Sequence, residues 1–126
     1  NSIFNTRRCF LVMSLALKLS EEYFLYSNQS NLTSIAKLLS TDSTYYSASL
    51  GFFIGKENII AMQTDFHSQY KKLHWGVDKV TEIKPNVIEI EFSFKGTSLD
   101  GLCSNRQDRE HILVIDGLIQ HIAVGL

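Results

Sequence analysis

The residues that most restrict the fold of this chain are Arg106 to Gly125, close to its C-terminal end. They contain two runs rich in β-branched residues, 110–115 and 118–124, which are separated by Asp116-Gly117. A tight turn between two twisted strands needs positive φ angles, and an Asp-Gly pair adopts them readily. The pattern therefore predicts a β-hairpin that closes the chain.

The first run of this hairpin is apolar on both faces. Ile112 and Val114 point to one face, and Leu113 and Ile115 point to the other, because side chains alternate along a strand. An antiparallel strand with one covered face would alternate with polar residues, so we expect cover on both faces. The chain's helices can cover one face, and further sheet or a second subunit must cover the other. We therefore expect a homodimer that forms through the sheet, with one of these pairs at the interface.

Upstream, the same strand becomes polar and ionisable. Arg106, Asp108 and Glu110 share the face of Ile112 and Val114. A face that changes from apolar to charged predicts a core that opens into a pocket, and we assign this face to the helices. A carboxyl held in such a pocket has a raised pKa. A bulge between residues 102 and 110 would invert the assignment upstream of it.

Length and composition fit one ordinary globular domain of 126 residues. The formal net charge of −1 gives no electrostatic reason to expect a nucleic-acid partner. Cys9 and Cys103 have no metal-binding spacing, so we expect free thiols in a reducing, cytoplasmic environment. The four histidines form no metal-ligand pattern, and we expect no metal and no other cofactor.

The N-terminal segment has two interpretations. Arg7-Arg8 and the apolar residues after it resemble the start of a secretory signal. Against this, Lys18 interrupts the apolar run, and no small-residue cleavage site follows before Glu21-Glu22. The run is also too short to span a membrane, so we expect no membrane partner. We favour a first helix within a single domain over 1–126, in which 1–12 form an N-terminal extension.

Periodicity along the chain predicts an α+β fold with three helices on one face of an antiparallel sheet. Helical spacing of apolar residues marks the segments 13–28, 31–39 and 56–70. Asn31 is a suitable N-cap for the second of these helices. Strand patterns follow, and residues 52–54 between two glycines indicate a turn; the expected strands are 44–47, 73–83, 87–94, 102–115 and 118–124.

Two motifs accompany this order of elements. One is a helix pair that leads into a strand, with Tyr23, Asn28, Asn31-Leu32, Ile35, Leu38-Leu39 and Asp42-Ser43-Thr44-Tyr45-Tyr46. The other is Gly51, followed by Gly55-Lys56-Glu57-Asn58-Ile59, before the third helix. With the closing hairpin, they resemble the nuclear-transport-factor-2-like (NTF2-like) superfamily, which includes SnoaL-like cyclases and ketosteroid isomerase. The resemblance covers about residues 13–124 and implies a cystatin-like cone, whose curled sheet encloses an apolar pocket and commonly forms dimers through its other face.

The resemblance also implies site residues. In ketosteroid isomerases a helix tyrosine and a protonated acid on a late strand donate hydrogen bonds to the substrate oxygen, while an aspartate moves the proton. The corresponding positions in this chain are Tyr23, Glu110 and Ser47. Serine is no general base without help, so we do not expect steroid isomerase activity.

Each candidate also has a purely structural interpretation. Tyr23 is alternatively a core residue with its hydroxyl at a wet edge, and Glu110 is alternatively paired with Arg106. Asp108 either raises the pKa of Glu110 as a neighbouring carboxylate or lies at the solvated end of the strand. The remaining candidates suit either a pocket wall or the core, namely Tyr45, Phe66 and Trp75. His74 is either an acid–base group or, as we prefer, a surface residue. We expect His111 and His121 to point outward or to lie at a subunit interface.

Two classes of function follow from these expectations. The first is a small acid–base enzyme, such as an isomerase, cyclase, dehydratase or epoxide hydrolase, that acts on an apolar, oxygen-bearing molecule. Tyr23 and Glu110 would be its catalytic groups. The second is a non-catalytic dimeric module that binds a small ligand or another protein. Convergence of Tyr23 and Glu110 in a cavity favours the enzyme, whereas a cavity filled by Phe, Tyr and Leu side chains favours the module.

Overall fold

The computed structural model describes residues 13–126, so the expectations for residues 1–12, including Cys9, lie outside the described part of the chain. The first described helix is α2 (Leu15–Asn28), and the Ser14 side chain caps it by accepting a hydrogen bond from the Leu17 amide. Helix α3 (Leu32–Leu38) begins after Asn31, whose side-chain Oδ1 accepts from the Ser34 amide. The predicted N-cap of the second helix is therefore confirmed.

The rest of the chain forms six strands and one further helix, which lies between the second and third strands. The order is β1 (Leu39–Ser47), β2 (Gly51–Ile54), α4 (Lys56–Ser68), β3 (Tyr70–Lys84), β4 (Val87–Ser98), β5 (Cys103–Ile115) and β6 (Leu118–Val124). The strands form one sheet in the spatial order β2-β1-β6-β5-β4-β3. The β1–β6 pair is parallel, and the other neighbours are antiparallel.

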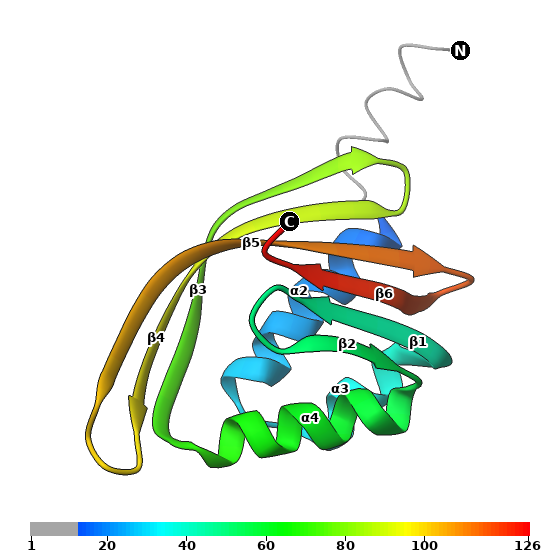
Figure 1. Cartoon of the computed structure of the whole chain (residues 1–126). Coiled ribbons are helices and arrows are strands. Elements are labelled where there is room, and N and C mark those ends of the chain that lie inside the picture. The colour runs from blue at the N-terminus through cyan, green and yellow to red at the C-terminus, as the bar shows by residue number, and fades with distance from the viewer. Residues whose placement is uncertain (1–12) are drawn as a thin grey trace, which may run out of the picture.

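The long strands bend strongly over the helices, which lie on the concave side of the sheet (Figure 1). The predicted architecture of three helices on a strongly curved, mostly antiparallel sheet is confirmed for the described residues. Inside the curve, β4 contributes its alternate apolar residues to the core, and Phe92 packs against Phe24 of α2 at 5.9 Å between ring centroids.

Two local predictions are wrong. Residues 52–54 form the edge strand β2, because they pair with β1 in a hairpin (Tyr46 with Phe52, Thr44 with Ile54). Helix α4 ends at Ser68, and Tyr70 begins β3 opposite Ser98. In both places, backbone pairing with a distant or adjacent strand overrides the local pattern.

The closing hairpin is confirmed. Asp116 and Gly117 have φ angles of 51° and 79°, as a tight turn between twisted strands requires. The register of β4 with β5 continues without a bulge from Val87–Leu113 to Thr97–Cys103, so pleat alternation holds along the whole strand. Glu110 therefore lies on the inner face together with Ile112 and Val114.

The far end of the sheet is shaped by a close approach between a side chain and the backbone. A side chain at Gly96 would place its Cβ 2.7 Å from the Tyr70 ring and 2.9 Å from the Phe94 ring. Glycine thus lets these two aromatic rings lie directly over β4, where they meet at 5.6 Å between centroids. They support the aromatic wall of the cavity described below, because Phe66 packs against both of them.

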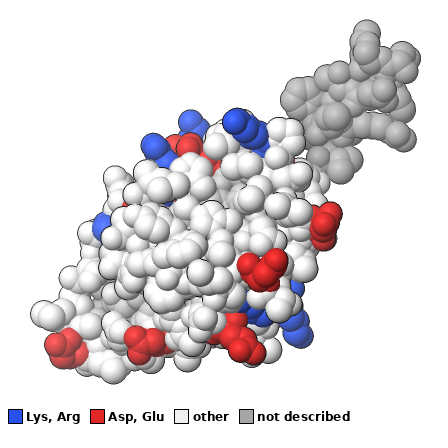
Figure 2. Space-filling model, turned by 45° about the vertical axis from the view of Figure 1, so that its right-hand side comes forward, with Lys and Arg blue, Asp and Glu red and all other residues white. Residues whose placement is uncertain are grey.

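Charged side chains are dispersed on the surface. On the face drawn in Figure 2 they lie mainly around the rim and leave a broad uncharged area between them. Within residues 13–126, none of the helices combines the length and the apolar character needed to cross a membrane.

Candidate functional site

A cavity with an accessible volume of about 50 Å³ lies between α2, α4 and the inner face of the sheet. Aromatic rings form much of its wall: Phe24 from α2, Phe66 from α4, Trp75 from β3 and Phe92 from β4. Trp75 is held from the helix side, because its amide donates to Asn28 Oδ1 at 2.7 Å and its carbonyl accepts from Asn28 Nδ2 at 3.0 Å. The cavity is therefore mainly apolar, and a few polar groups reach into it from several elements.

Glu110 is the ionisable group that fits this environment least. It lies on β5 between Ile90 of β4 and Val124 of β6, and its residue is only 4% exposed. Its Oε2 atom is buried without a hydrogen-bond partner. Burial first, and the charge of Asp108 second, raise the pKa of Glu110 to about 8. At neutral pH the carboxyl is therefore mostly protonated and can donate a hydrogen bond or a proton.

Tyr23 supplies a second hydroxyl donor from α2. Gln63 of α4 donates its Nε2 hydrogen to the Tyr23 hydroxyl oxygen at 2.7 Å, which leaves the hydroxyl hydrogen for another acceptor. Burial, followed by the charge of Glu110, raises the pKa of Tyr23 well above its ordinary value. The phenol is therefore neutral at every physiological pH. Tyr23 and Glu110 reach the same cavity from opposite sides, the helix layer and the sheet.

Tyr45 and Arg106 are two further polar residues on the sheet side of the cavity. Burial and the charge of Glu110 raise the pKa of the Tyr45 phenol, while the Arg106 guanidinium acts in the opposite direction. Arg106 stacks over Phe94 with its Cζ atom 5.6 Å from the ring centroid. Within residues 13–126 it forms no ion pair with Glu110. The alternative expectation, in which Glu110 is paired with Arg106, is therefore wrong.

His67 reaches the cavity from the last turn of α4. Its Nδ1 atom lies 2.9 Å from the Ser30 hydroxyl, and its ring packs against Trp75 at 5.4 Å between centroids. Burial lowers the pKa of His67, so the imidazole is neutral at neutral pH. The cavity thus contains a protonated acid, two neutral phenols and a neutral nitrogen base.

Known structures share this architecture, although no protein-family model and no curated protein matches the chain. An NTF2-like protein of unknown function from Burkholderia pseudomallei aligns with a TM-score of 0.81 at 14% identity, covering 90% of this chain and 92% of that one. A proposed SnoaL-like polyketide cyclase from Jannaschia sp. CCS1 aligns at 0.78 and 12% identity, covering 87% and 83%. The chain has the NTF2-like fold.

The fold alone leaves the activity open. An LEH-like epoxide hydrolase from M. tuberculosis aligns with a TM-score of 0.77 at 11% identity, covering 88% of this chain and 81% of that one. Proteins of unknown function and enzymes therefore share this architecture. Identity at this level carries the fold and no particular reaction with it.

The NTF2-like fold brings most of the predicted site residues to one place. The structure puts these on the cavity wall: Tyr23, Tyr45, Ser47, Phe66, Trp75 and Glu110. Ser47 is occupied locally, since its hydroxyl oxygen accepts from the amides of Ser49 and Leu50 in the turn before β2. The roles of these predicted site residues in binding or catalysis are proposals.

Asp108 is the predicted pocket residue that the structure does not bring to this cavity. It borders a separate surface depression with Asp78 and Glu91, and its Oδ1 accepts from the Arg109 amide at 2.8 Å. It shares the pleat face of Glu110 but does not line the cavity, although Arg106, two residues upstream on the same face, does. Its carboxylate acts on the site only through its charge, which adds to the raised pKa of Glu110.

Sequence reasoning missed three polar residues of the cavity, Ser27, Gln63 and His67. Gln63 and His67 belong to α4, where the apolar residues Ile59, Met62 and Phe66 mark the inner side. Gln63 follows Ile59 by four positions, and His67 follows Gln63 by four, so helical spacing puts all three on one side. A search for polar residues on the apolar stripe would have found them.

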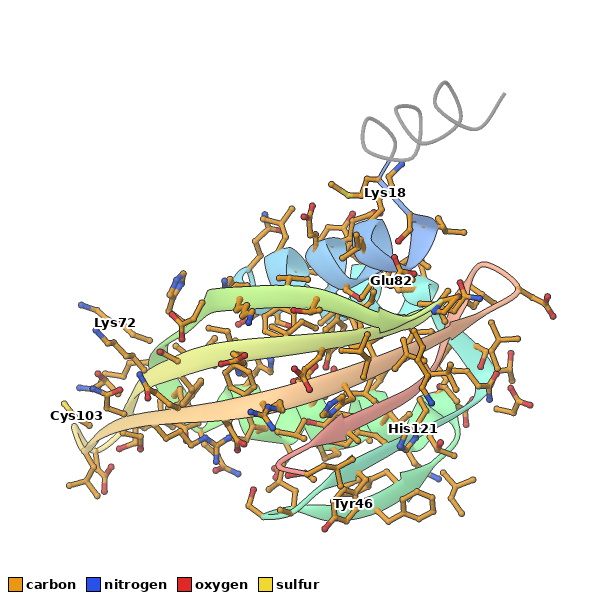
Figure 3. All side chains as sticks on the ribbon, turned by 90° about the horizontal axis from the view of Figure 1, so that it is seen from above. Lys18, Tyr46, Lys72, Glu82, Cys103 and His121 are labelled. Carbon is orange, nitrogen blue, oxygen red and sulfur yellow. The ribbon has the colours of Figure 1, made fainter. Side chains whose placement is uncertain are left out.

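The other histidines lie away from the cavity. His74 is exposed, whereas His111 contacts Glu89 at 3.0 Å and His121 contacts Thr44 at 2.7 Å. Figure 3 shows His121 and Tyr46 close together on β6 and β1. No cluster of three or more His, Cys, Asp or Glu side chains able to hold a metal occurs within residues 13–126.

Proposed function

We propose that this protein is a small acid–base enzyme that acts on a compact, apolar molecule carrying a carbonyl or epoxide oxygen. The observation that carries the proposal is Glu110, a buried carboxyl on the wall of an aromatic cavity whose Oε2 has no partner within the protein. A buried polar atom without a partner is costly and calls for an explanation. A substrate oxygen that accepts its proton would supply the missing partner.

Tyr23 and Glu110 act together in this proposal. Removal of a proton beside a carbonyl, or opening of an epoxide, builds negative charge on the substrate oxygen. Two neutral donors aimed at that oxygen stabilise the charge without first having to give up water, and they act strongly in an apolar cavity. Gln63 donates to the Tyr23 hydroxyl oxygen at 2.7 Å, so the hydroxyl hydrogen stays available for an acceptor in the cavity.

The size of the cavity limits the substrate. Its accessible volume of about 50 Å³ lies well below the roughly 300–1,000 Å³ of drug-sized ligand sites. Leu50 and Met62 also line it, and Leu50 is 45% exposed, so these two side chains are able to move aside for a ligand. The substrate is therefore a small ring or short chain, or it enters with displacement of these residues.

The same small volume favours the second candidate, a non-catalytic module. In that case the aromatic side chains fill the interior and the protein acts by binding through its surface. Glu110-dependent binding of a small oxygen-bearing molecule would exclude a module that acts only through its surface. Turnover of the bound molecule would separate the enzyme from a module that binds a small ligand.

The association that we propose is a homodimer through the outer face of the sheet. Leu113 is half-buried and Ile115 is 46% exposed in the single chain, on the face opposite the core. A polar substitution, Leu113→Arg, should shift the molecular mass measured by light scattering from two chains toward one. A wild-type protein that stays monomeric at micromolar concentration would contradict the dimer.

The exposed free thiol of Cys103 fits a reducing, cytoplasmic location, which is likewise a proposal.

Phenol is a suitable first probe, because it presents one hydrogen-bonding oxygen on a small apolar ring, and toluene is its matched control without the oxygen. Trp75 lines the cavity and is the chain's only tryptophan, so its fluorescence reports binding. We expect phenol to bind at least about tenfold more tightly than toluene, corresponding to about 1.4 kcal/mol. Glu110→Leu should abolish this preference, whereas Glu91→Gln outside the cavity should keep it.

Titration of Glu110 by carboxyl-resolved NMR completes the test. The proposal expects a pKa close to 8. A pKa close to the ordinary value of 4.5, together with equal binding of phenol and toluene, would overturn the enzyme proposal and favour the module.

A further inference from the structure

We propose that His67 is the catalytic base of this site and takes a proton from the carbon next to a carbonyl group held by Glu110 and Tyr23. This inference rests on the proposed function, which names the donors for the carbonyl oxygen and no group that removes the proton.

The chemistry of the groups on the cavity wall leaves His67 as the base. Ser47, at the position where the resemblance implies a base, is already bonded to the Ser49 and Leu50 amides. Glu110 is the single carboxyl on the cavity wall among residues 13–126, and it serves as the acid. The other polar groups there are phenols, a serine hydroxyl, an amide and a guanidinium, none of which accepts a proton readily at neutral pH. His67 is the remaining basic atom.

The contacts of the His67 ring also suit this role. The Ser30 hydroxyl lies 2.9 Å from His67 Nδ1, and Trp75 packs along the ring, so the imidazole is held in one orientation. For Nε2 to accept a proton, Nδ1 must carry the hydrogen and donate it to the Ser30 oxygen. His67 also follows Gln63 by four positions on α4, so the imidazole and the Gln63–Tyr23 pair share one side of the helix.

Protonation states support this assignment. Burial acts in opposite senses on the two groups: it lowers the pKa of His67 and raises that of Glu110 to about 8. At neutral pH the base is thus free of its proton and the acid carries one. Arg106, Tyr23 and Tyr45 are the other ionisable groups that line the cavity. Titratable groups whose pKa values diverge in this way are a recurring sign of acid–base pairs.

The proposed step is a balanced proton transfer. Nε2 of His67 takes the proton, and the C–H electron pair becomes the new carbon–carbon double bond. The carbonyl π electrons move to the oxygen, which takes the Glu110 proton and accepts a hydrogen bond from Tyr23. The result is a neutral enol, an imidazolium and a carboxylate. Return of the proton from His67 to the same carbon, or to a conjugated one, and of the enol proton to Glu110, restores the enzyme.

Hydrogen exchange on cyclohexanone in D₂O tests the step, since removal and return of an α-proton replaces it with deuterium, which NMR detects. We expect the wild-type protein to accelerate exchange above the buffer rate. His67→Gln and His67→Asn should each lower the rate by about 10²–10⁴-fold. His74→Gln removes an exposed histidine outside the cavity and should leave the rate unchanged.

Ser30 acts as a positioning residue in this scheme. Ser30→Ala should lower the exchange rate less than the His67 variants, about tenfold, and should shift the acidic limb of the pH–rate profile. The His67 variants should lose that limb altogether, which a merely structural role would not produce. Two His67 variants are used because one that fails to fold, as judged by thermal unfolding, leaves the other to decide.

The outcomes separate the two proposals. If phenol binding depends on Glu110 but cyclohexanone exchange is absent, or is unaffected by both His67 substitutions, the inference about His67 is overturned and the donor site stands. If phenol shows no Glu110-dependent binding, the proposed function itself is overturned. Exchange that depends on both His67 and Glu110 supports both.

Discussion

Glu89 and Glu110 are the same residue type on neighbouring strands of one sheet, yet their surroundings are opposite. Glu110 of β5 pairs in register with Ile90, and Glu89 of β4 pairs with His111, so the two carboxyls point to opposite faces. Glu110 is 4% exposed and its Oε2 has no partner. Glu89 has its Oε2 3.0 Å from His111 Nε2 and 3.9 Å from Arg109 Nε.

This comparison shows that the pleat position, rather than the residue type, decides the chemistry. On the outer face, Glu89 is partly exposed to water beside His111 and Arg109, and such partly solvated pairs contribute little to stability. On the inner face, the loss of water favours the neutral acid and raises its pKa. The predictions below test this difference, from the largest expected effect to the smallest.

The largest effect concerns the pH dependence of stability. Because the folded-state pKa of Glu110 is raised to about 8 from an ordinary value of 4.5, the folded protein holds this proton between those pH values and the unfolded protein does not. The stabilisation is fully present below about pH 4.5 and is lost as the pH rises toward 8. At about 1.4 kcal/mol for each pKa unit, the loss is on the order of 5 kcal/mol at most.

Urea unfolding at pH 5, 7 and 9 measures this loss. Glu110→Gln carries no titrating proton, so the difference in the free energy of unfolding between wild type and this variant isolates Glu110 from His67 and other groups. The variant should gain stability relative to wild type as the pH rises. Parallel curves for the two proteins across this range would contradict a neutral Glu110 in the folded state.

The second prediction compares apolar residues on the two faces of β5. Ile112 is completely buried, whereas Ile115 is 46% exposed. Ile112→Ala should lower the free energy of unfolding by about 2–5 kcal/mol, because it leaves a cavity in the core, and Ile115→Ala by less than about 1 kcal/mol. Denaturant unfolding at low protein concentration measures both. Equal losses would mean that the outer face is buried too, as in a tight dimer.

Features of the fold and the site that depend on local sequence patterns were predicted correctly. Alternation along 106–115 predicted which side of the sheet carries Glu110, because β5 runs without a bulge against β4. Asp116-Gly117 predicted the hairpin, since the turn depends on local backbone angles. These features are set by residues near each other in the chain, so the local pattern is sufficient.

Features that depend on distant partners were predicted poorly. Residues 52–54 look like a turn until β1 is available to pair with them. Asp108 lies between Arg106 and Glu110 on one pleat face, yet only these two line the cavity and Asp108 borders a separate depression. His67 was missed for a different reason: it is a polar residue on the apolar side of α4, where its ring packs against Trp75 and its Nδ1 lies near the Ser30 hydroxyl. Pattern alone does not fix where a pocket closes.

The smallest expected effect concerns the outer carboxylate. Glu89 is partly exposed, with a side-chain exposure of 24%, and it lies near Arg109 and His111. Glu89→Gln should lower the free energy of unfolding by only about 0.5 kcal/mol, because a partly solvated ion pair gains little over its hydrated components. Urea unfolding of this variant, of His111→Gln and of the double variant gives the coupling energy between the two side chains. A coupling above about 1.5 kcal/mol at low protein concentration would show that this pair is desolvated as strongly as the inner face. If the coupling instead grows with protein concentration, the second subunit of the proposed dimer covers it.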